Sequence, residues 1–437
     1  MYMKKSYVML FTLLITSIFL LVACTEKETG TEMVTKPVPQ VTKEVDKKKD
    51  PVELLMYSWR PEDREAYEKF IAEFEAKNED IKVTFKPYKS TEYGTILTNA
   101  LMSGQGPDII QLRPYEGAIS IIDGDFIVPL DDVKGIKDIS VDYLKAAQGA
   151  DGKVYGVPLS LNAGVIFYNK DVFDEHGFEV PTTWDELLAV SEEMIAKDII
   201  PIAQAGKASY LLSLTHSVIG APMYGTEYVD DLLSGKADLT DERFKKSVER
   251  MEQLESLFPK DFIALDDKDT QAMFYTGKAA MYINGSYRLE TFESTNPDMN
   301  IGIIPSFAET KGGETPFVTW VDGSFSVVKA SKHQEEALRF MEFMASKDFG
   351  QMFSDELDRI SAIPGVEPTH ELVKEMTKLG EDNPASYMML VHLGGGSPST
   401  KTTFENALQG MYIDALTVDG LIDESQKSMD KWFEPTK

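Results

Sequence analysis

The order of apolar and polar residues predicts alternating strands and helices from residue 52 onward. An apolar run at 52–57 predicts a first strand, and apolar positions alternate with polar ones at 81–85 as in a second. Between them, apolar residues recur at i, i+3, i+4 and i+7, which places them on one face of a helix. These are Tyr67, Phe70, Ile71 and Phe74. A helix at 92–102 then leads into a third strand at 108–112. This β-α-β-α-β order predicts an α/β fold with a mostly parallel sheet.

Helical patterns continue in the second half of the chain. Thr183 and Glu186 have the spacing of a capping box and predict that a helix begins there. A long helix is predicted over 241–257, with an apolar stripe on one side. The stripe consists of Phe244, Val248, Met251 and Leu254. We interpret both apolar faces as core.

The first 24 residues have the composition of a secretory signal. Lys4 and Lys5 precede an apolar run at 7–22, and the small residue Ala23 follows before Cys24. The run is shorter than the roughly 20 apolar residues of a membrane-spanning helix. Residues 1–23 are therefore predicted to be a signal peptide that is removed from the mature protein.

Cys24 is the one cysteine of the sequence, so a disulfide framework is excluded. It ends the sequence LVAC, which resembles the bacterial lipobox, whose cysteine receives fatty acyl chains such as palmitate and becomes the new N-terminus. A free thiol in an ordinary signal is the alternative. Residues 24–50 are rich in Thr, Lys, Glu and Pro and predict a flexible tether behind this lipidation site. We expect a lipid-anchored protein on the extracytoplasmic face of the cell membrane.

Size and charge narrow the possible functions. The chain after the tether is longer than one typical core supports, so two lobes are expected. The formal charge of −28 argues against a nucleic-acid partner. The five histidines are scattered, and no GxSxG, HExxH or phosphate-loop pattern occurs. We therefore expect no metal, no cofactor and no catalytic residues.

Several short motifs occur together in the mature chain. They are GPDII at 106–110, VPLD at 128–131, DGKVYGVPLSLNAGVIFYNK at 151–170, PTTWDE at 181–186, FYTGKAAMYINGSYR at 274–288 and IGIIPSF at 301–307. In this order and spacing they resemble the extracellular solute-binding proteins of carbohydrate ABC transporters, the family that includes maltose-binding protein. The resemblance implies a monomer that binds a sugar, closes around it, and delivers it to the permease subunits of an importer.

The resemblance also implies two discontinuous lobes joined by hinge crossings, the periplasmic-binding-protein fold. Residues 51–160 and 302–350 are expected in the first lobe, and residues 161–301 and 351–437 in the second. The crossings near Ser160 and Ile301 would then form the hinge.

Candidate ligand-binding residues come from two arguments. Ligands of parallel sheets bind beyond the carboxyl ends of the strands, which is where Trp59, Arg60, Arg113 and Tyr115 lie. The resemblance adds a second set: Asn162, Tyr210, Tyr287, Trp320, Asp322, Gly323 and Arg359. Aromatic rings suit the apolar face of a pyranose, and the polar groups suit its hydroxyls. Gly323 would let the backbone approach the ligand. A solvated arginine explains Arg359 equally well.

Two other classes of function stay open at this point. The 72 acidic residues always offer some carboxylate pair, so an exported glycosidase is conceivable. A related binding lipoprotein for polyamines, peptides or iron is the other alternative. Asp322 beside Trp320 would suit a cationic ligand.

Overall fold

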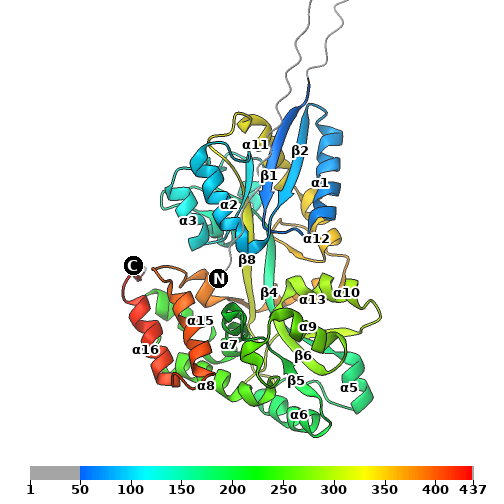
Figure 1. Ribbon diagram of the computed structural model, residues 1–437, viewed down its shortest axis with the longest axis vertical. Helices are drawn as coiled ribbons and strands as arrows, with labels where there is room; N and C mark the ends of the chain where they lie inside the picture. The colour runs from blue at the N-terminus through cyan, green and yellow to red at the C-terminus, as the bar shows by residue number, and fades with distance from the viewer. Residues whose placement is uncertain (1–49, 436–437) are drawn as a thin grey trace, which may run out of the picture. The chain divides into compact units, whose positions relative to one another are not determined.

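The computed structural model describes residues 50–435, in which the strands form one continuous sheet (Figure 1). The strand order is β2-β1-β3-β8-β4-β6-β5, and β7, β9 and β10 pair beside this path. The strands are β1 (Val52–Ser58), β2 (Ile81–Pro87), β3 (Ile109–Leu112), β4 (Val157–Asn169), β5 (Ile200–Ala203), β6 (Ala279–Gly285), β7 (Ile301–Ile304), β8 (Phe317–Val327), β9 (Ile360–Ser361) and β10 (Pro384–Ser386). The predicted signal peptide, Cys24 and nearly all of the tether lie outside the described residues.

The first lobe is built on the parallel strands β2, β1 and β3, with β8 antiparallel to β3. Its helices are α1 (Arg64–Lys77), α2 (Ser90–Ser103), α3 (Glu116–Asp123), α4 (Val141–Leu144), α11 (Gln334–Met344) and α12 (Lys347–Leu357), with the 3-10 turns η1 (Ile136–Asp138) and η2 (Lys145–Ala147). Two apolar clusters fill this lobe, and the stripe predicted on α1 is buried in the larger one.

The second lobe surrounds β6, which pairs with β5 on one side and β4 on the other. Its helices are α5 (Lys170–His176), α6 (Trp184–Ala196), α7 (Ser209–Leu233), α8 (Glu242–Leu254), α9 (Asp267–Tyr275), α10 (Leu289–Thr295), α13 (Glu371–Asp382), α14 (Met388–Val391), α15 (Thr400–Met411) and α16 (Val418–Met429). The 3-10 turns are η3 (Glu255–Leu257), η4 (Phe262–Ala264) and η5 (Ser286–Arg288). The stripe predicted on α8 is fully buried here.

Two long strands, β4 and β8, run from one lobe into the other (Figure 1). The first part of β4 pairs with β8, whereas its last part pairs with β6 and β7. The fold is therefore the expected α/β arrangement of two discontinuous lobes. Strands that belong to both lobes are suited to act as a hinge, because a small change along each strand moves the lobes as rigid bodies.

Local signals in the sequence are confirmed at the ends of elements. The Thr183 hydroxyl accepts a hydrogen bond from the Glu186 backbone N–H at 3.3 Å. The Glu186 carboxylate accepts one from the Thr183 N–H at 3.2 Å, which completes the capping box at the start of α6. The helix predicted over 241–257 is α8 followed by the short turn η3, so the α-helix itself ends at Leu254.

Two segments pack differently from the lobe assignment made from the sequence. The resemblance predicts residues 302–316 in the first lobe, but β7 pairs with β4 beside β6, and Ala308 pairs with Thr183. It predicts residues after 350 in the second lobe, but α12 packs on α1 of the first. We therefore propose that the chain returns to the first lobe within β8 and leaves it after α12.

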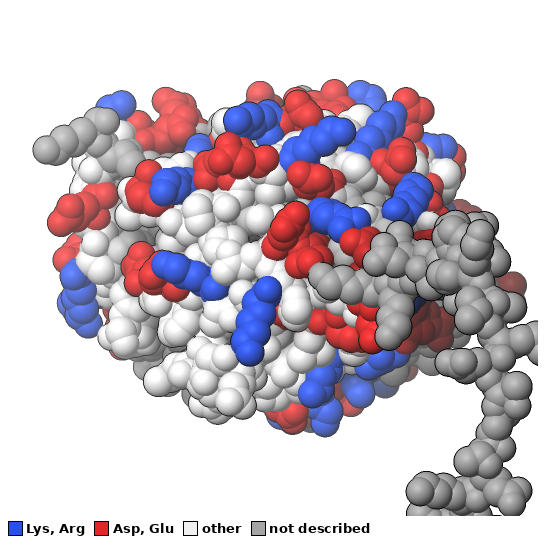
Figure 2. Space-filling model, turned by 90° about the horizontal axis from the view of Figure 1, so that it is seen from above, with Lys and Arg blue, Asp and Glu red and all other residues white. Residues whose placement is uncertain are grey.

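The surface of the described residues is charged and mixed in sign. Figure 2 shows acidic and basic side chains interspersed on the face that it views, beside an area with few charges. No helix among the described residues combines the length and apolar character needed to cross a bilayer.

Candidate functional site

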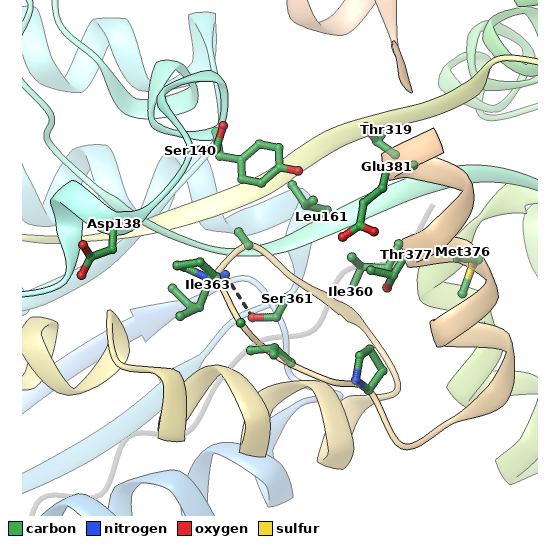
Figure 3. Close-up of a pocket in the computed structure, with 17 residues that line it drawn as sticks. Asp138, Ser140, Leu161, Thr319, Ile360, Ser361, Ile363, Met376, Thr377 and Glu381 are labelled. Carbon is green, nitrogen blue, oxygen red and sulfur yellow. Dashed lines mark hydrogen bonds between the residues drawn. The ribbon is translucent and has the colours of Figure 1, made fainter. Parts of the chain in front are cut away.

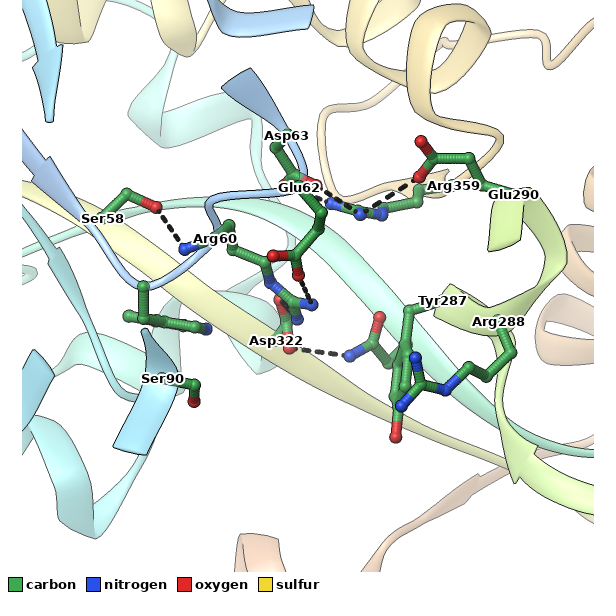
Figure 4. A network of polar contacts seen from close by, with 12 residues as sticks. Ser58, Arg60, Glu62, Asp63, Ser90, Tyr287, Arg288, Glu290, Asp322 and Arg359 are labelled. Atoms are coloured by element: carbon green, nitrogen blue, oxygen red, sulfur yellow. Dashed lines mark hydrogen bonds and ion pairs between the residues drawn. The ribbon is translucent and has the colours of Figure 1, made fainter. Parts of the chain in front are cut away.

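The Asp322 carboxylate joins three segments at the junction of the lobes (Figure 4). It accepts hydrogen bonds from the Arg60 guanidinium and, at 2.7 Å, from Asn162 Nδ2. Arg60 follows β1, while Asn162 and Asp322 lie on the shared strands β4 and β8. Burial alone would raise the pKa of Asp322, but the Arg60 and Arg359 guanidinium groups hold this pKa below its usual value. The carboxylate is therefore ionised at neutral pH.

Strand register explains why these side chains meet. Asn162 pairs directly with Trp320, so both point to the same face of the sheet. The register shifts between the Leu161–Val321 and Ser160–Gly323 pairs, which leaves Asp322 as an extra residue. Such a bulge re-aims a side chain, and here it accompanies the turn of Asp322 toward Arg60 and Asn162.

Tyr287 forms the second-lobe side of the site. The Arg60 guanidinium lies 5.8 Å from the centre of the Tyr287 ring, and the Arg288 guanidinium lies 5.1 Å from it. The Tyr287 hydroxyl donates to Asn284 Oδ1 at 2.8 Å. Tyr210, at the start of α7, is 40 % exposed and interacts with Tyr287 and Arg288. Burial, followed by Asp267, raises the pKa of Tyr210.

An ion pair network under Tyr287 was missed in the sequence. The Asp267 carboxylate accepts hydrogen bonds from Arg288, from the Tyr282 hydroxyl and, at 3.0 Å, from Asn284 Nδ2. Arg288 stands in the motif quoted at 274–288 and was available as a candidate. Asp267 lies outside that motif, at the start of α9, and no local pattern distinguishes it from other acidic residues near helix starts.

Trp59 lies in the core of the first lobe. It is 3 % exposed, with Arg113 stacked 4.2 Å from its ring centre and Tyr93 against it edge-on. A side chain at Gly323 would bring Cβ within 2.5 Å of the Trp59 ring, so this packing requires a glycine. Arg113 is exposed and donates to Ser90 Oγ at 2.8 Å. In this arrangement Arg113, rather than the Trp59 ring, faces solvent.

Trp320 is also buried and packs edge-on against Tyr387, with the ring centres 5.4 Å apart.

The Tyr115 hydroxyl accepts a hydrogen bond from the Val321 backbone N–H at 3.1 Å, so Tyr115 is attached to the crossing strand β8. The Tyr115 backbone has a positive φ of 57°. This conformation is unfavourable for a residue with a side chain, and strained residues of this kind cluster at functional sites.

Arg359 is buried in a two-pronged ion pair with Asp63, at 2.6 and 2.7 Å. Its guanidinium also lies 3.6 Å from Glu290 on α10. Asp63 precedes α1 of the first lobe and Glu290 belongs to the second, so Arg359 connects the lobes. The solvated arginine considered from the sequence is wrong, because Arg359 is only 5 % exposed.

Three buried polar atoms near Asp322 and Tyr287 have no hydrogen-bond partner among the described residues. They are Arg60 Nε, Asn162 Oδ1 and Arg288 Nε. Unpartnered buried groups are costly, and a ligand or water that supplies the matching donor or acceptor removes this cost. The site therefore offers two donors and one acceptor beside the exposed Tyr210 ring.

Comparison with known proteins shows to which family the chain belongs. A model of the bacterial extracellular solute-binding protein family matches residues 58–351. The chain belongs to this family. Among curated members, the multiple sugar-binding protein of Streptococcus mutans is 28 % identical over 76 % of this chain and 80 % of its own. The melibiose/raffinose/stachyose-binding protein MelE of Bacillus subtilis is 23 % identical over 67 % of this chain and 70 % of its own.

A solved member of the same fold is RafE from Streptococcus pneumoniae, in its apo form. It superimposes with a TM-score of 0.71 at 22 % identity, covering 88 % of this solute-binding protein and 98 % of RafE. At this identity the likeness shows the fold, and it agrees with the two lobes described above.

Proposed function

We propose that this solute-binding protein captures a sugar or oligosaccharide outside the cell and delivers it to the permease subunits of an ABC importer. The names of its relatives support this proposal, because the proteins of S. mutans and B. subtilis described above are both sugar-binding proteins. The chemistry of the site supports it independently.

The observation that carries the proposal is the internal charge balance of the site. Arg60 is paired with Asp322, and Arg288 is paired with Asp267. A polyamine would need unpaired carboxylates, and these two are already neutralised. The groups left over are the donors and the acceptor without partners, which suit the hydroxyls of a neutral sugar. A ring of the ligand would pack on the exposed Tyr210.

The alternatives find less support in the same residues. No three His, Cys, Asp or Glu side chains gather into a possible metal site anywhere in 50–435, so an iron site built from these residue types finds no support there. A glycosidase needs one carboxyl group that stays protonated as the general acid. The pKa of Asp322 is lowered, which is the wrong direction for that role. Burial raises the pKa of Glu290, but this carboxylate lies 3.6 Å from the Arg359 guanidinium, whose charge favours its ionised form. We propose a binding protein without catalytic activity.

Capture would proceed by lobe closure around β4 and β8. A ligand that contacts Arg60 after β1 and Tyr287 after β6 touches both lobes, so it binds the closed arrangement more tightly and shifts the population toward it. We further propose that the protein acts as a monomer and is held on the outer face of the membrane by acylated Cys24 and the tether at 24–50.

A thermal-shift panel tests the ligand class. Raffinose, melibiose, xylo-oligosaccharides, chito-oligosaccharides, spermidine, a peptide mixture and ferric citrate are compared, since a ligand stabilises the folded protein by RT ln(1 + [L]/Kd). We expect a neutral sugar to raise Tm, and we expect Asn162→Ala to abolish this rise. Asn300→Ala, at an exposed amide bound to Asp171, is the matched control and should retain it. Stabilisation by ferric citrate alone, or by spermidine alone in a way that Asn162→Ala abolishes, would overturn the proposal, and cleavage of the sugar would favour the glycosidase.

A further inference from the structure

A cavity of about 300 Å³ lies beside the hinge strands β4 and β8 (Figure 3). Leu161 and Thr319 line it, and each directly precedes a site residue on its strand, Asn162 and Trp320 respectively. Since successive side chains of a strand point to opposite faces, the cavity and the sugar site share β4 and β8 but lie on different faces. This cavity, called the hinge cavity below, is separate from the proposed sugar site.

The two walls of the hinge cavity come from different lobes. Asp138 and Tyr143, from η1 and α4, form the first-lobe wall. Thr377 and Glu381, from α13, form the second-lobe wall. A movement of the lobes about β4 and β8 therefore changes the distance between these walls. A molecule held by both walls would favour one arrangement of the lobes over others.

The lining of the hinge cavity is acidic at two ends and apolar between them. Figure 3 shows Asp138 and Glu381 at opposite ends, with Leu161 between them. Neither carboxylate has an ion-pair partner in the part of the chain that the structure describes. Ile360 and Ile363 contribute the apolar part. Burial, and next the charge of Glu381, raises the pKa of Tyr143, so this carboxylate lies close to the ring. Lys378 also lies near Glu381, but its ion pair is with Asp382.

We propose that the hinge cavity binds a short aliphatic diamine that bridges the two lobes. One ammonium group would pair with Asp138, the other with Glu381, and the hydrocarbon chain would lie over the apolar part. A volume of about 300 Å³ falls at the lower end of small-molecule sites and suits such a ligand. The protein would then carry a second solute site that responds to organic cations and is linked to lobe closure.

Isothermal titration calorimetry of the full chain tests this proposal without any sugar. The probes are 1,6-diaminohexane, hexylamine with one charge, and 1,6-hexanediol with none. We expect saturable binding of the diamine, weaker binding of the monoamine and no binding of the diol. Asp138→Asn and Glu381→Gln should each weaken diamine binding about fivefold, the loss expected for one partly exposed ion pair. Glu375→Gln, an exposed position of α13 outside the cavity lining, is the matched control and should bind normally.

Hydrogen exchange then locates the bound diamine. Saturating 1,6-diaminohexane should slow exchange in residues 136–144 and 360–381, which border the hinge cavity, and this protection should be lost in Glu381→Gln. Absence of saturable diamine binding, or equal affinity in the two cavity variants and in Glu375→Gln, would overturn the proposal. If only one of the two substitutions, Asp138→Asn or Glu381→Gln, lowers the affinity, the diamine does not bridge the lobes and that part of the proposal is wrong.

Discussion

Arg359 provides the sharpest test of how the site is built. The sequence made it a candidate for ligand binding, whereas its contacts predict a role in stability. Both members of the Arg359–Asp63 pair are buried, at 5 % and 2 % exposure of their side chains. Arg359→Met would remove the guanidinium but fill a similar volume, and Asp63 would be left as a buried charge without its partner.

The magnitude follows from that burial. Breaking a buried ion pair from one side typically costs about 3–5 kcal/mol, because the remaining charge keeps its desolvation penalty. For a domain of this size, each kcal/mol lowers Tm by about 2–4 °C, so Arg359→Met should lower Tm by roughly 6–20 °C. The double variant Asp63→Leu, Arg359→Met removes both charges and should recover most of the loss.

Urea unfolding and calorimetry of the four proteins in this double-mutant cycle measure the coupling. Arg64→Met is the matched control, because Arg64 is half exposed, forms an ion pair with the exposed Glu68 and a long hydrogen bond to the Phe85 carbonyl at 3.5 Å, and should cost less than about 1 kcal/mol. If Arg359→Met is as stable as the wild type but no longer binds the sugar, the reasoning is refuted and Arg359 is a ligand-binding residue.

Four further predictions address the packing, the binding site, the pH response and the anchor. Trp59→Ala should destabilise the protein by about 3–5 kcal/mol in urea unfolding, since the ring is 3 % exposed; unchanged stability would assign the ring to an open cleft. Tyr210→Ala should leave Tm nearly unchanged, because the side chain is 40 % exposed, and should weaken the sugar found in the panel by about tenfold, or 1.4 kcal/mol, in calorimetry. An unaltered affinity would exclude stacking at this ring. Burial lowers the pKa of His216 to about 3, so the stability that its neutral form contributes is complete above pH 6.5 and is lost as the pH falls toward 3. The loss should reach about 2 kcal/mol at pH 5, and a His216→Gln variant with the same pH slope in urea unfolding would contradict this assignment. Cys24→Ala should release the protein from the membrane or leave an uncleaved precursor, and a membrane-bound, lipid-labelled mature form of that variant would exclude the lipobox.

The sequence by itself determined those features whose cause lies within one or two turns of the chain. The apolar stripe on α1 and the Thr183 capping box depend on spacings of three or four residues, and both were predicted correctly. Alternation of strands and helices predicted the α/β class, and the position after β1 placed Arg60 at the edge of the sheet. The motifs at 151–170 and 274–288 contained Asn162 and Tyr287.

The tertiary structure decided which partner each side chain meets. Arg60 lies 262 positions from Asp322 and Arg359 lies 296 from Asp63, and only the crossings of β4 and β8 bring these groups together. Trp59 follows a strand and has polar neighbours in the sequence, as a cleft residue would. In the structure Gly323 and Arg113, from other parts of the chain, enclose its ring. The short-range periodicity of apolar residues indicates which face of a helix or strand is buried. The choice of contacts across that face depends on strand register, on the bulge at Asp322 and on the return of the chain between lobes.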